Sequence, residues 1–191
     1  MCTAWESTKS PDHVKHPRLL HKACALVLLQ GECAVVSPRG TTVVRLVAGP
    51  GHESIPLVHA WGRSQFHEYL AMELLGVGLD KIRSAITLRN AVALSLQLID
   101  ALEFVHSHGI VHCDIKPGNL MLGAAERNPG RVRLIDFGLC RLYRDPVTLK
   151  HLPDKGTPRT IGTPAYASVN EHLHHWPPVE TTWSLYHTAF S

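Results

Sequence analysis

Residues 112–119 read His-Cys-Asp-Ile-Lys-Pro-Gly-Asn, and residues 136–138 read Asp-Phe-Gly. Each stretch lies beside a short apolar run, residues 120–122 for the first and residues 132–135 for the second. Proline and glycine inside the first stretch supply turn chemistry, which predicts a stiff loop. Together the two stretches place four polar side chains of particular types on two loops, and the interpretation of the chain starts from them.

These four side chains match the needs of phosphoryl transfer. The transition state of that reaction spreads negative charge over the phosphoryl oxygens, so catalysis consists mainly of positioning and charge neutralisation. Asp114 can accept a hydroxyl proton, and Lys116 can neutralise the transferring group. Asn119 and Asp136 can hold Mg²⁺, a hard cation that prefers oxygen ligands. The alternatives are an ordinary turn aspartate and a strand-end carboxylate, and the combined spacing favours the catalytic interpretation.

The composition fits one globular domain. The chain has 191 residues, of which 45% are hydrophobic, so it can bury a real core. A formal net charge of +3 is too small to indicate binding to nucleic acid or to a membrane surface. No apolar run reaches the roughly eighteen residues of a transmembrane helix, and residues 1–10 lack the apolar core of a signal peptide.

The cysteines and histidines carry weaker signals. Five cysteines without a CxxC pair favour free thiols in a reducing compartment, the cytoplasm or the nucleus: Cys2, Cys24, Cys33, Cys113 and Cys140. Fourteen histidines include an HxH at residues 106–108 and a cluster at residues 172–175. Metal binding is one interpretation, but scattered surface histidines are favoured because no cysteine or carboxylate stands at zinc-finger spacing.

The periodicity predicts helices and strands around the two loops. Residues 18–30 read as a helix followed by glycine, and residues 33–47 as a hairpin or a loose insertion. Two strand-like runs follow at residues 55–61 and 68–74. Residues 87–108 form the longest predicted helix, and beyond Leu142 the chain is expected to be rich in loops.

Local sequence also predicts how the long helix begins, ends and packs. Thr87 can cap its N-terminus, and Gly109 ends it. The residues expected to share one apolar face are Leu88, Val92, Ser95, Ile99, Leu102 and Val105.

This order of elements and motifs resembles a protein kinase from its regulatory helix onward, and more narrowly the casein kinase 1 group. Four segments carry the resemblance: His16–Leu20 with Leu28–Gly31, Met72–Gly76, Leu134–Leu139 with Tyr143–Asp145, and Gly162–Asn170. The last resembles the group's GTxxYAS(I/V)N motif and is the most specific. The resemblance implies an α+β, incomplete kinase-like fold, with a partial N-lobe over residues 1–75 and a truncated, mainly helical C-lobe over residues 76–191.

The resemblance also implies a nucleotide site that uses ATP and Mg²⁺. Met72 would be the gatekeeper at the back of the pocket, and Glu73 and Leu75 would offer backbone groups to adenine. Met121 and Ile135 would form the floor under the ring. Without the matching positions, each of these would read as plain core.

One further residue receives a role from the same resemblance. Thr163 would hydrogen-bond near Asp114 and Lys116 and steady the substrate-facing loop, whereas Ser168 and Asn170 would be structural.

The phosphate-binding part of the kinase pattern is missing. Gly76-Val77-Gly78 lacks a third glycine and falls in the hinge, so it is not a phosphate cradle. Ala4 stands where the resemblance places the strand lysine, and Lys22 stands where it places the glutamate partner of that lysine. Both halves of the activating ion pair are therefore expected to be absent.

Three other positions depart from the group. Cys113 replaces the arginine that pairs with an activation-loop phosphate, which suggests no switching by phosphorylation there. Ala165 replaces a basic residue that reads acidic substrates, and Thr181 replaces the aspartate that opens a later helix. With the chain ending at Ser191, we expect a domain truncated at both ends.

Two functions stay open on the sequence. One is a serine/threonine kinase that transfers the ATP γ-phosphate to a protein substrate. The other is a pseudokinase or degenerate fragment that binds a nucleotide or a protein without turnover.

Overall fold

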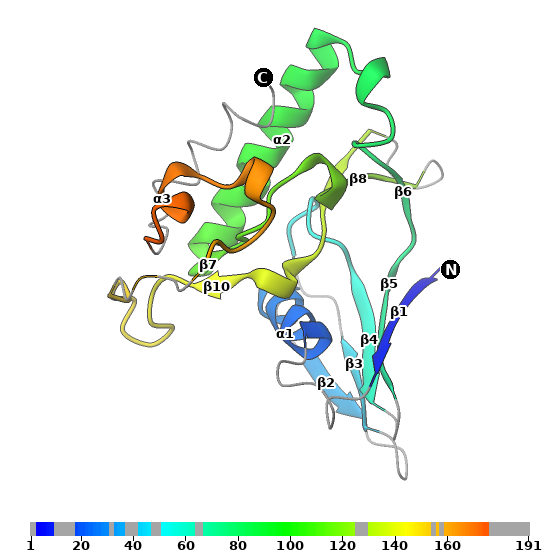
Figure 1. Cartoon of the computed structure of the whole chain (residues 1–191). Helices are drawn as coiled ribbons and strands as arrows, with labels where there is room; N and C mark the ends of the chain where they lie inside the picture. Colours follow the sequence, from blue (N-terminus) through cyan, green and yellow to red (C-terminus); the bar gives the residue numbers. More distant parts are fainter. Residues whose placement is uncertain are drawn as a thin grey trace.

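A computed structural model describes most of the chain (Figure 1). The described residues are 3–9, 18–30, 33–36, 42–46, 51–63, 67–124, 130–153, 156 and 159–175. Two expectations lie outside them, namely the turn at residues 38–40 and the Thr181 segment. The described part combines one larger sheet, two helices of more than two turns and two small ladders, and this confirms the α+β class.

The larger sheet has five antiparallel strands in the order β1-β5-β4-β3-β2. Their bounds are Thr3–Lys9 (β1), Cys33–Val36 (β2), Thr42–Leu46 (β3), Val58–Arg63 (β4) and His67–Glu73 (β5). β2 and β3 pair with each other, so the insertion after the first helix is a hairpin, one of the two forms expected. β1 pairs with β5 in a register that sets Ala4 opposite Met72.

Helix α1 spans Arg18–Gln30, the range predicted from the periodicity. Its buried side chains recur at helical spacing and include Leu19, Ala23, Leu26 and Leu29. The helix contacts β4 and β5 on one side and the short helix η4 (Phe137–Leu139) on the other. It therefore links the sheet to the second polar loop.

Helix α2 spans Leu88–Ser107 and begins and ends as predicted. The Thr87 side chain accepts a hydrogen bond from the Asn90 N–H at 3.3 Å, and Gly109 adopts a positive φ of 75° after the last turn. The predicted apolar face is partly wrong, because Leu88 and Val92 are 83% and 54% exposed. Leu102 and Val105 are buried as predicted, and the other apolar side chains of α2 that enter the core are Leu94, Leu98 and Ala101.

Two small ladders complete the core of the fold. One joins β6 (Leu75–Gly78), β8 (Leu120–Gly123) and β9 (Val132–Leu134) in the order β6-β8-β9. The other pairs β7 (Ile110–Val111) with β10 (Arg141–Leu142). One continuous cluster of buried apolar side chains runs from α1 and the larger sheet through α2 to these ladders.

The remaining elements are short. Helical turns occur at η2 (Arg83–Ala85), η3 (Pro117–Asn119) and η5 (Pro164–Tyr166), and α3 spans Val169–His172. The described chain after Leu142 is mostly loop, as expected. Across the part of the chain that is described, no helix has the length and hydropathy needed to cross a membrane.

The packing of α2 generates a matched pair of substitutions. Leu98 is fully buried and Leu96 on the same helix is 62% exposed. Leu98→Ala should lower the free energy of unfolding by about 3 kcal/mol, because it removes buried methyl groups and leaves a cavity. Leu96→Ala should change it by less than about 0.5 kcal/mol. Urea unfolding followed by circular dichroism measures both, and equal losses would contradict the assigned face.

Candidate active site

The pairing of β8 with β9 brings the two polar loops together at one end. Asn119 immediately precedes β8, and Ile135 and Asp136 immediately follow β9. Leu120 is opposite Leu134, and the Ile135 N–H donates to the Asn119 carbonyl oxygen at 2.9 Å. Asn119 and Asp136 are the two residues expected to share a metal ion. They are close along the backbone, because Asp136 directly follows Ile135, which is hydrogen-bonded to Asn119.

At their other ends the same loops are joined by β7 and β10, with Val111 opposite Arg141. His112 follows β7 directly and lies between the loops. Its Nε2 donates to the Ile135 carbonyl oxygen at 2.9 Å, and its Nδ1 accepts from the Asp114 N–H at 3.2 Å. Its ring meets Phe137 edge-on, with centroids 4.7 Å apart.

The His112 imidazole is fully buried, and burial lowers its pKa to about 4. This outweighs the hydrogen bond to Ile135 and the charges of Asp114 and Asp136, which favour protonation. Both carboxylates act on the same ring, so they lie in one neighbourhood. The pattern of one donated and one accepted bond requires the neutral ring with its proton on Nε2.

The Asp114 carboxylate is the centre of a hydrogen-bond network. Its Oδ1 accepts from Thr163 Oγ1 at 2.8 Å, and its Oδ2 accepts from Lys116 Nζ at 2.8 Å and from Asn119 Nδ2 at 3.0 Å. Lys116 Nζ also donates to Thr163 Oγ1 at 2.7 Å. The structure therefore brings together Asp114, Lys116, Asn119 and Thr163.

The environment keeps Asp114 ionised. Burial acts to raise its pKa, but the hydrogen bonds from Lys116 and Thr163, the Lys116 charge and the Asn119 hydrogen bond lower it further than burial raises it. A carboxylate has about four lone-pair sites, and three accept the bonds described above. The remaining site is on Oδ1, which within the described residues accepts only from Thr163.

Asn119 and Asp136 have donor atoms suited to a hard cation. The Asn119 amide nitrogen donates to both the carbonyl oxygen and Oδ2 of Asp114, at 2.8 and 3.0 Å, which leaves the amide oxygen as its ligand atom. The Asp136 side chain is exposed, and no hydrogen bond or ion pair to it occurs among the described residues. Asp136 has a φ of 64°, a conformation uncommon for a residue with a Cβ.

This donor set is small. No group of three or more His, Cys, Asp or Glu side chains that could hold a metal occurs in the described ranges. One carboxylate and one amide oxygen fit Mg²⁺, which keeps several waters and shares phosphate oxygens when it is bound.

The expected adenine contacts come from three elements. Met72 is buried in β5, Leu75 begins β6 opposite Gly123, and Met121 in β8 is half-buried, as is Ile135. The Glu73 N–H already donates to the Leu57 carbonyl oxygen at 2.8 Å. The adenine contacts of these residues stay predictions.

Sequence reasoning missed the role of the Glu73 side chain. Its Oε1 accepts from Arg133 Nε at 2.9 Å and from the Leu57 N–H at 3.3 Å. This pair ties the hinge to β9, and nothing in the sequence connects two residues 60 positions apart.

Ala4 lies on β1 and Lys22 on α1, and their correspondence to the two ion-pair positions stays a prediction. Ala4 is opposite Met72 in the sheet, and Lys22 is 6% exposed on α1, the helix that contacts η4. A buried lysine thus stands on α1 at the position where the resemblance implies a glutamate.

The segment around Gly162 holds Thr163 against Asp114. Gly162 has a φ of 85°, and a Cβ there would lie 2.3 Å from the Cys113 carbonyl oxygen. On α3, the Ser168 side chain accepts from the Glu171 N–H at 3.3 Å, and Glu171 Oε2 accepts from the Ile161 N–H at 2.9 Å. Glu171 was missed, although the Ser-x-x-Glu spacing is a recognisable capping signal.

Two histidines contradict the expectation that the histidines are scattered over the surface. His106 and His112 are buried and do not belong to a surface set. His106 contacts the Tyr143 ring edge-on, and burial lowers its pKa to about 4.

Comparisons with known proteins give two findings. The protein kinase domain family matches residues 42–183. Casein kinase I homolog RAG8 from Kluyveromyces lactis is 34% identical over 128 residues, which is 64% of this chain and 24% of that protein. The chain thus spans about a quarter of the length of this curated relative.

The buried histidines predict a loss of stability in mild acid. His106 and His112 have a pKa of about 4 in the folded protein and about 6.5 when unfolded, so the unfolded chain binds more protons between these values. Each should lower the free energy of unfolding by about 2 kcal/mol from pH 7 to pH 5. Urea unfolding at both pH values measures the change.

Two variants separate this effect from general acid sensitivity. His106→Gln should remove about half of the loss, whereas His108→Gln, at an exposed site, should leave it unchanged. Glu68 acts in the opposite direction because burial raises its pKa, so the histidines must outweigh it. Stability that stays level or rises toward pH 5 would contradict the assignment.

Gly162 and Gly118 form a second matched pair. Gly162→Ala should lower the free energy of unfolding by at least about 1–2 kcal/mol, because the new Cβ would overlap the Cys113 carbonyl and the φ is positive. Gly118→Ala meets no atom within 4 Å and should be nearly neutral. Thermal unfolding of both variants tests this, and a neutral Gly162→Ala would show that the segment can move away from Asp114.

Proposed function

This chain belongs to the protein kinase family, and we propose that it acts as a serine/threonine kinase, transferring the γ-phosphoryl group of ATP to a hydroxyl group of a protein substrate. The family match and the likeness to a casein kinase I homolog confirm the resemblance to the casein kinase 1 group and the partial kinase-like fold. The residue roles that follow are part of the proposal.

The observation that carries the proposal is the network around Asp114. Lys116, Asn119 and Thr163 fix the carboxylate in one orientation and leave one lone-pair site on Oδ1. A substrate hydroxyl would donate to that site, and Asp114 would hold its proton as the oxygen attacks. Lys116 Nζ lies 2.8 Å from Oδ2, where its positive charge would neutralise the oxygens of a bound phosphoryl group.

The same loops would hold the nucleotide and its metal ion. Asn119 Oδ1 and the Asp136 carboxylate would bind Mg²⁺, and the bound ion would neutralise charge on the phosphate oxygens. Met72, Glu73 and Leu75 would contact adenine from the hinge side. Met121 and Ile135 come from neighbouring positions on β8 and after β9, which supports their role as a floor.

A second candidate is nucleotide binding without turnover, and the ion-pair positions favour it. The Ala4 side chain has no charged group that could bind a phosphate. Lys22 on α1 carries a positive charge, so it cannot form the ion pair that a glutamate would form with the strand lysine of a kinase. Loss of one charged donor to the transition state costs on the order of 10²–10³ in rate.

Binding is tested by thermal unfolding of the purified chain with and without Mg-ATP. The melting temperature should rise with Mg-ATP and not with ATP in the presence of EDTA, because ligands that bind only the folded state stabilise it. Asp136→Ala should abolish the rise, whereas Asp100→Ala, which removes an exposed carboxylate on α2, should retain it. A melting temperature that saturating Mg-ATP leaves unchanged would overturn both candidate functions.

Turnover is tested by transfer of labelled phosphate to a peptide set in which serine or threonine is flanked by acidic, basic or neutral residues, because Ala165 replaces the basic residue that reads acidic substrates. Wild-type chain should label it, and Asp114→Asn should reduce labelling by about 10²-fold or more while the thermal shift persists, because the proton acceptor is lost and the metal ligands remain. A thermal shift without labelling by the wild type would overturn the kinase and establish the binding function.

A further inference from the structure

The hinge between the larger sheet and the small ladder β6-β8-β9 is a single residue, Leu74 (Figure 1). Glu73 ends β5 on one side of it, and Leu75 begins β6 on the other. The orientation of the sheet relative to the ladder therefore depends on contacts that cross this residue. The Glu73–Arg133 ion pair is such a contact, because Arg133 lies in β9 and its Nε donates to Glu73 Oε1 at 2.9 Å.

The strand register places Arg133 on the ladder face that is proposed to lie under the adenine ring. Arg133 is opposite Met121, and side chains of directly opposed residues lie on the same face of a sheet. Ile135 continues this face, because strand side chains alternate and its N–H still donates to β8 at the Asn119 carbonyl oxygen. The other face carries side chains that are at most 3% exposed and belong to the core, namely Leu120, Val132 and Leu134.

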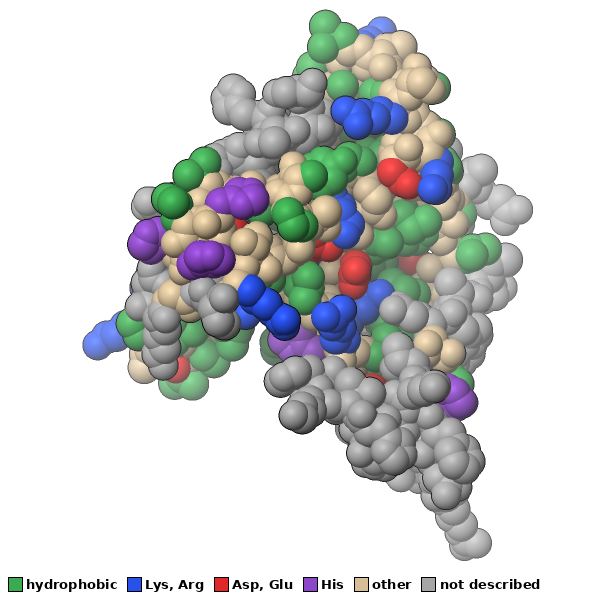
Figure 2. Space-filling view, in the orientation of Figure 1, with side chains coloured by type: hydrophobic (Ala, Val, Ile, Leu, Met, Phe, Trp, Pro, Cys, Tyr) green, Lys and Arg blue, Asp and Glu red, His purple; other side chains and the backbone are tan. Residues whose placement is uncertain are grey.

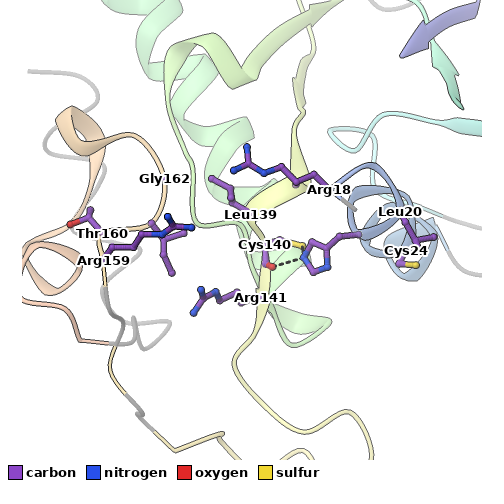
Figure 3. Close-up of a pocket in the computed structure, with 12 residues that line it drawn as sticks. Arg18, Leu20, Cys24, Leu139, Cys140, Arg141, Arg159, Thr160 and Gly162 are labelled. Carbon is purple, nitrogen blue, oxygen red and sulfur yellow. Dashed lines mark hydrogen bonds between the residues drawn. The ribbon is translucent and has the colours of Figure 1, made fainter. Parts of the chain in front are cut away.

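Arg133 differs from the arginines at the surface. Figure 2 shows several Lys and Arg side chains exposed on one face of the molecule. Figure 3 shows Arg18, Arg141 and Arg159 beside a cavity of about 860 Å³, and no residue of β6, β8 or β9 lines that cavity. Arg133 is instead 7% exposed, and its Nη1 is buried without a hydrogen-bond partner in the described part of the chain.

Burial limits how much the pair can stabilise the fold. Removal of two charges from water costs free energy that their attraction returns only in part, and a buried guanidinium nitrogen without an acceptor adds to that cost. Apolar side chains of similar size would fill the same space without it. The pair instead provides a fixed direction, since Glu73 Oε1 accepts from the Leu57 N–H at 3.3 Å as well as from Arg133.

We propose that Glu73 and Arg133 form a positioning pair that holds the hinge backbone against the adenine floor and thereby determines selectivity for the 6-amino purine of ATP. This role rests on the nucleotide binding proposed above. Arg133, opposite Met121, fixes Glu73 relative to the floor, and the backbone groups of Glu73 and Leu75 would meet the edge of the base. A displacement of about 1 Å is enough to weaken such contacts.

The base itself supplies the probe for this role. Adenine has a hydrogen-bond donor at its 6-position and an acceptor at N1, whereas the hypoxanthine of ITP has an acceptor and a donor at the same two places. A hinge with fixed backbone groups favours one pattern over the other, because the wrong base leaves polar groups unpaired. A hinge that can shift loses this preference.

The test measures the dissociation constants of Mg-ATP and Mg-ITP for the full chain by isothermal titration calorimetry. The wild-type chain should prefer Mg-ATP. Arg133→Met and Glu73→Gln should each weaken Mg-ATP binding by about tenfold, roughly the effect of one hydrogen bond, and change Mg-ITP binding by less than about twofold. The double variant should be no weaker than either single variant, because both substitutions remove the same interaction.

Control variants separate positioning from packing. Arg131→Met breaks the exposed ion pair between Arg131 Nη2 and Glu53 Oε2 at 3.1 Å and should leave both affinities unchanged. Arg133→Lys keeps the charge and should restore most of the preference that Arg133→Met loses. Circular dichroism at the titration temperature identifies the folded variants. If Arg133→Met does not fold, Glu73→Gln makes the same comparison, because its amide oxygen can still accept from the Leu57 N–H.

The possible outcomes distinguish this role from the proposed function. A wild-type chain that binds neither nucleotide would overturn both. A wild-type chain that binds Mg-ATP without preferring it to Mg-ITP would overturn the positioning role alone. The same conclusion would follow if the variants kept the wild-type preference, or if they lost affinity for both nucleotides equally, as a merely structural pair would.

Discussion

The geometry of the candidate site depends on a single buried imidazole. His112 donates from Nε2 to the carbonyl oxygen before Asp136 and accepts at Nδ1 from the N–H of Asp114. Only a neutral ring can make both bonds, and burial keeps it neutral. The backbones of the two loops of the candidate site are therefore joined by a side chain that contributes no charge of its own.

Two short ladders make this bridge possible. β8 with β9 closes the loops at one end, and β7 with β10 closes them at the other. Residues 112–119 connect β7 to β8, and residues 135–140 connect β9 to β10, so both segments join the same two ladders. His112 lies between these two segments. The strands are only two to four residues long, so their register positions the polar side chains more than it adds to stability.

Features encoded by neighbouring residues could be predicted from the sequence. The α1 range, the Thr87 cap and the end of α2 at Gly109 all follow from interactions within a few residues. The contacts of Asp114 with Lys116 and Asn119 follow from the spacing of one motif. Thr163 was placed near them only through the resemblance, because its contact spans 49 residues.

Features that depend on the choice between competing partners could not be predicted. α2 has apolar residues on two sides, and periodicity does not tell which side faces the core; here Val92 is exposed and Leu98 is buried.

The hairpin of β2 and β3 shows another such choice, since it continues the sheet beyond β4. The β2–β3 hairpin lies at one edge of the sheet, so the pairing of β1 with β5 and of β5 with β4 does not depend on it. Length variation at this point is thus structurally inexpensive, and the fold can diverge there while the half that holds the candidate site stays constant.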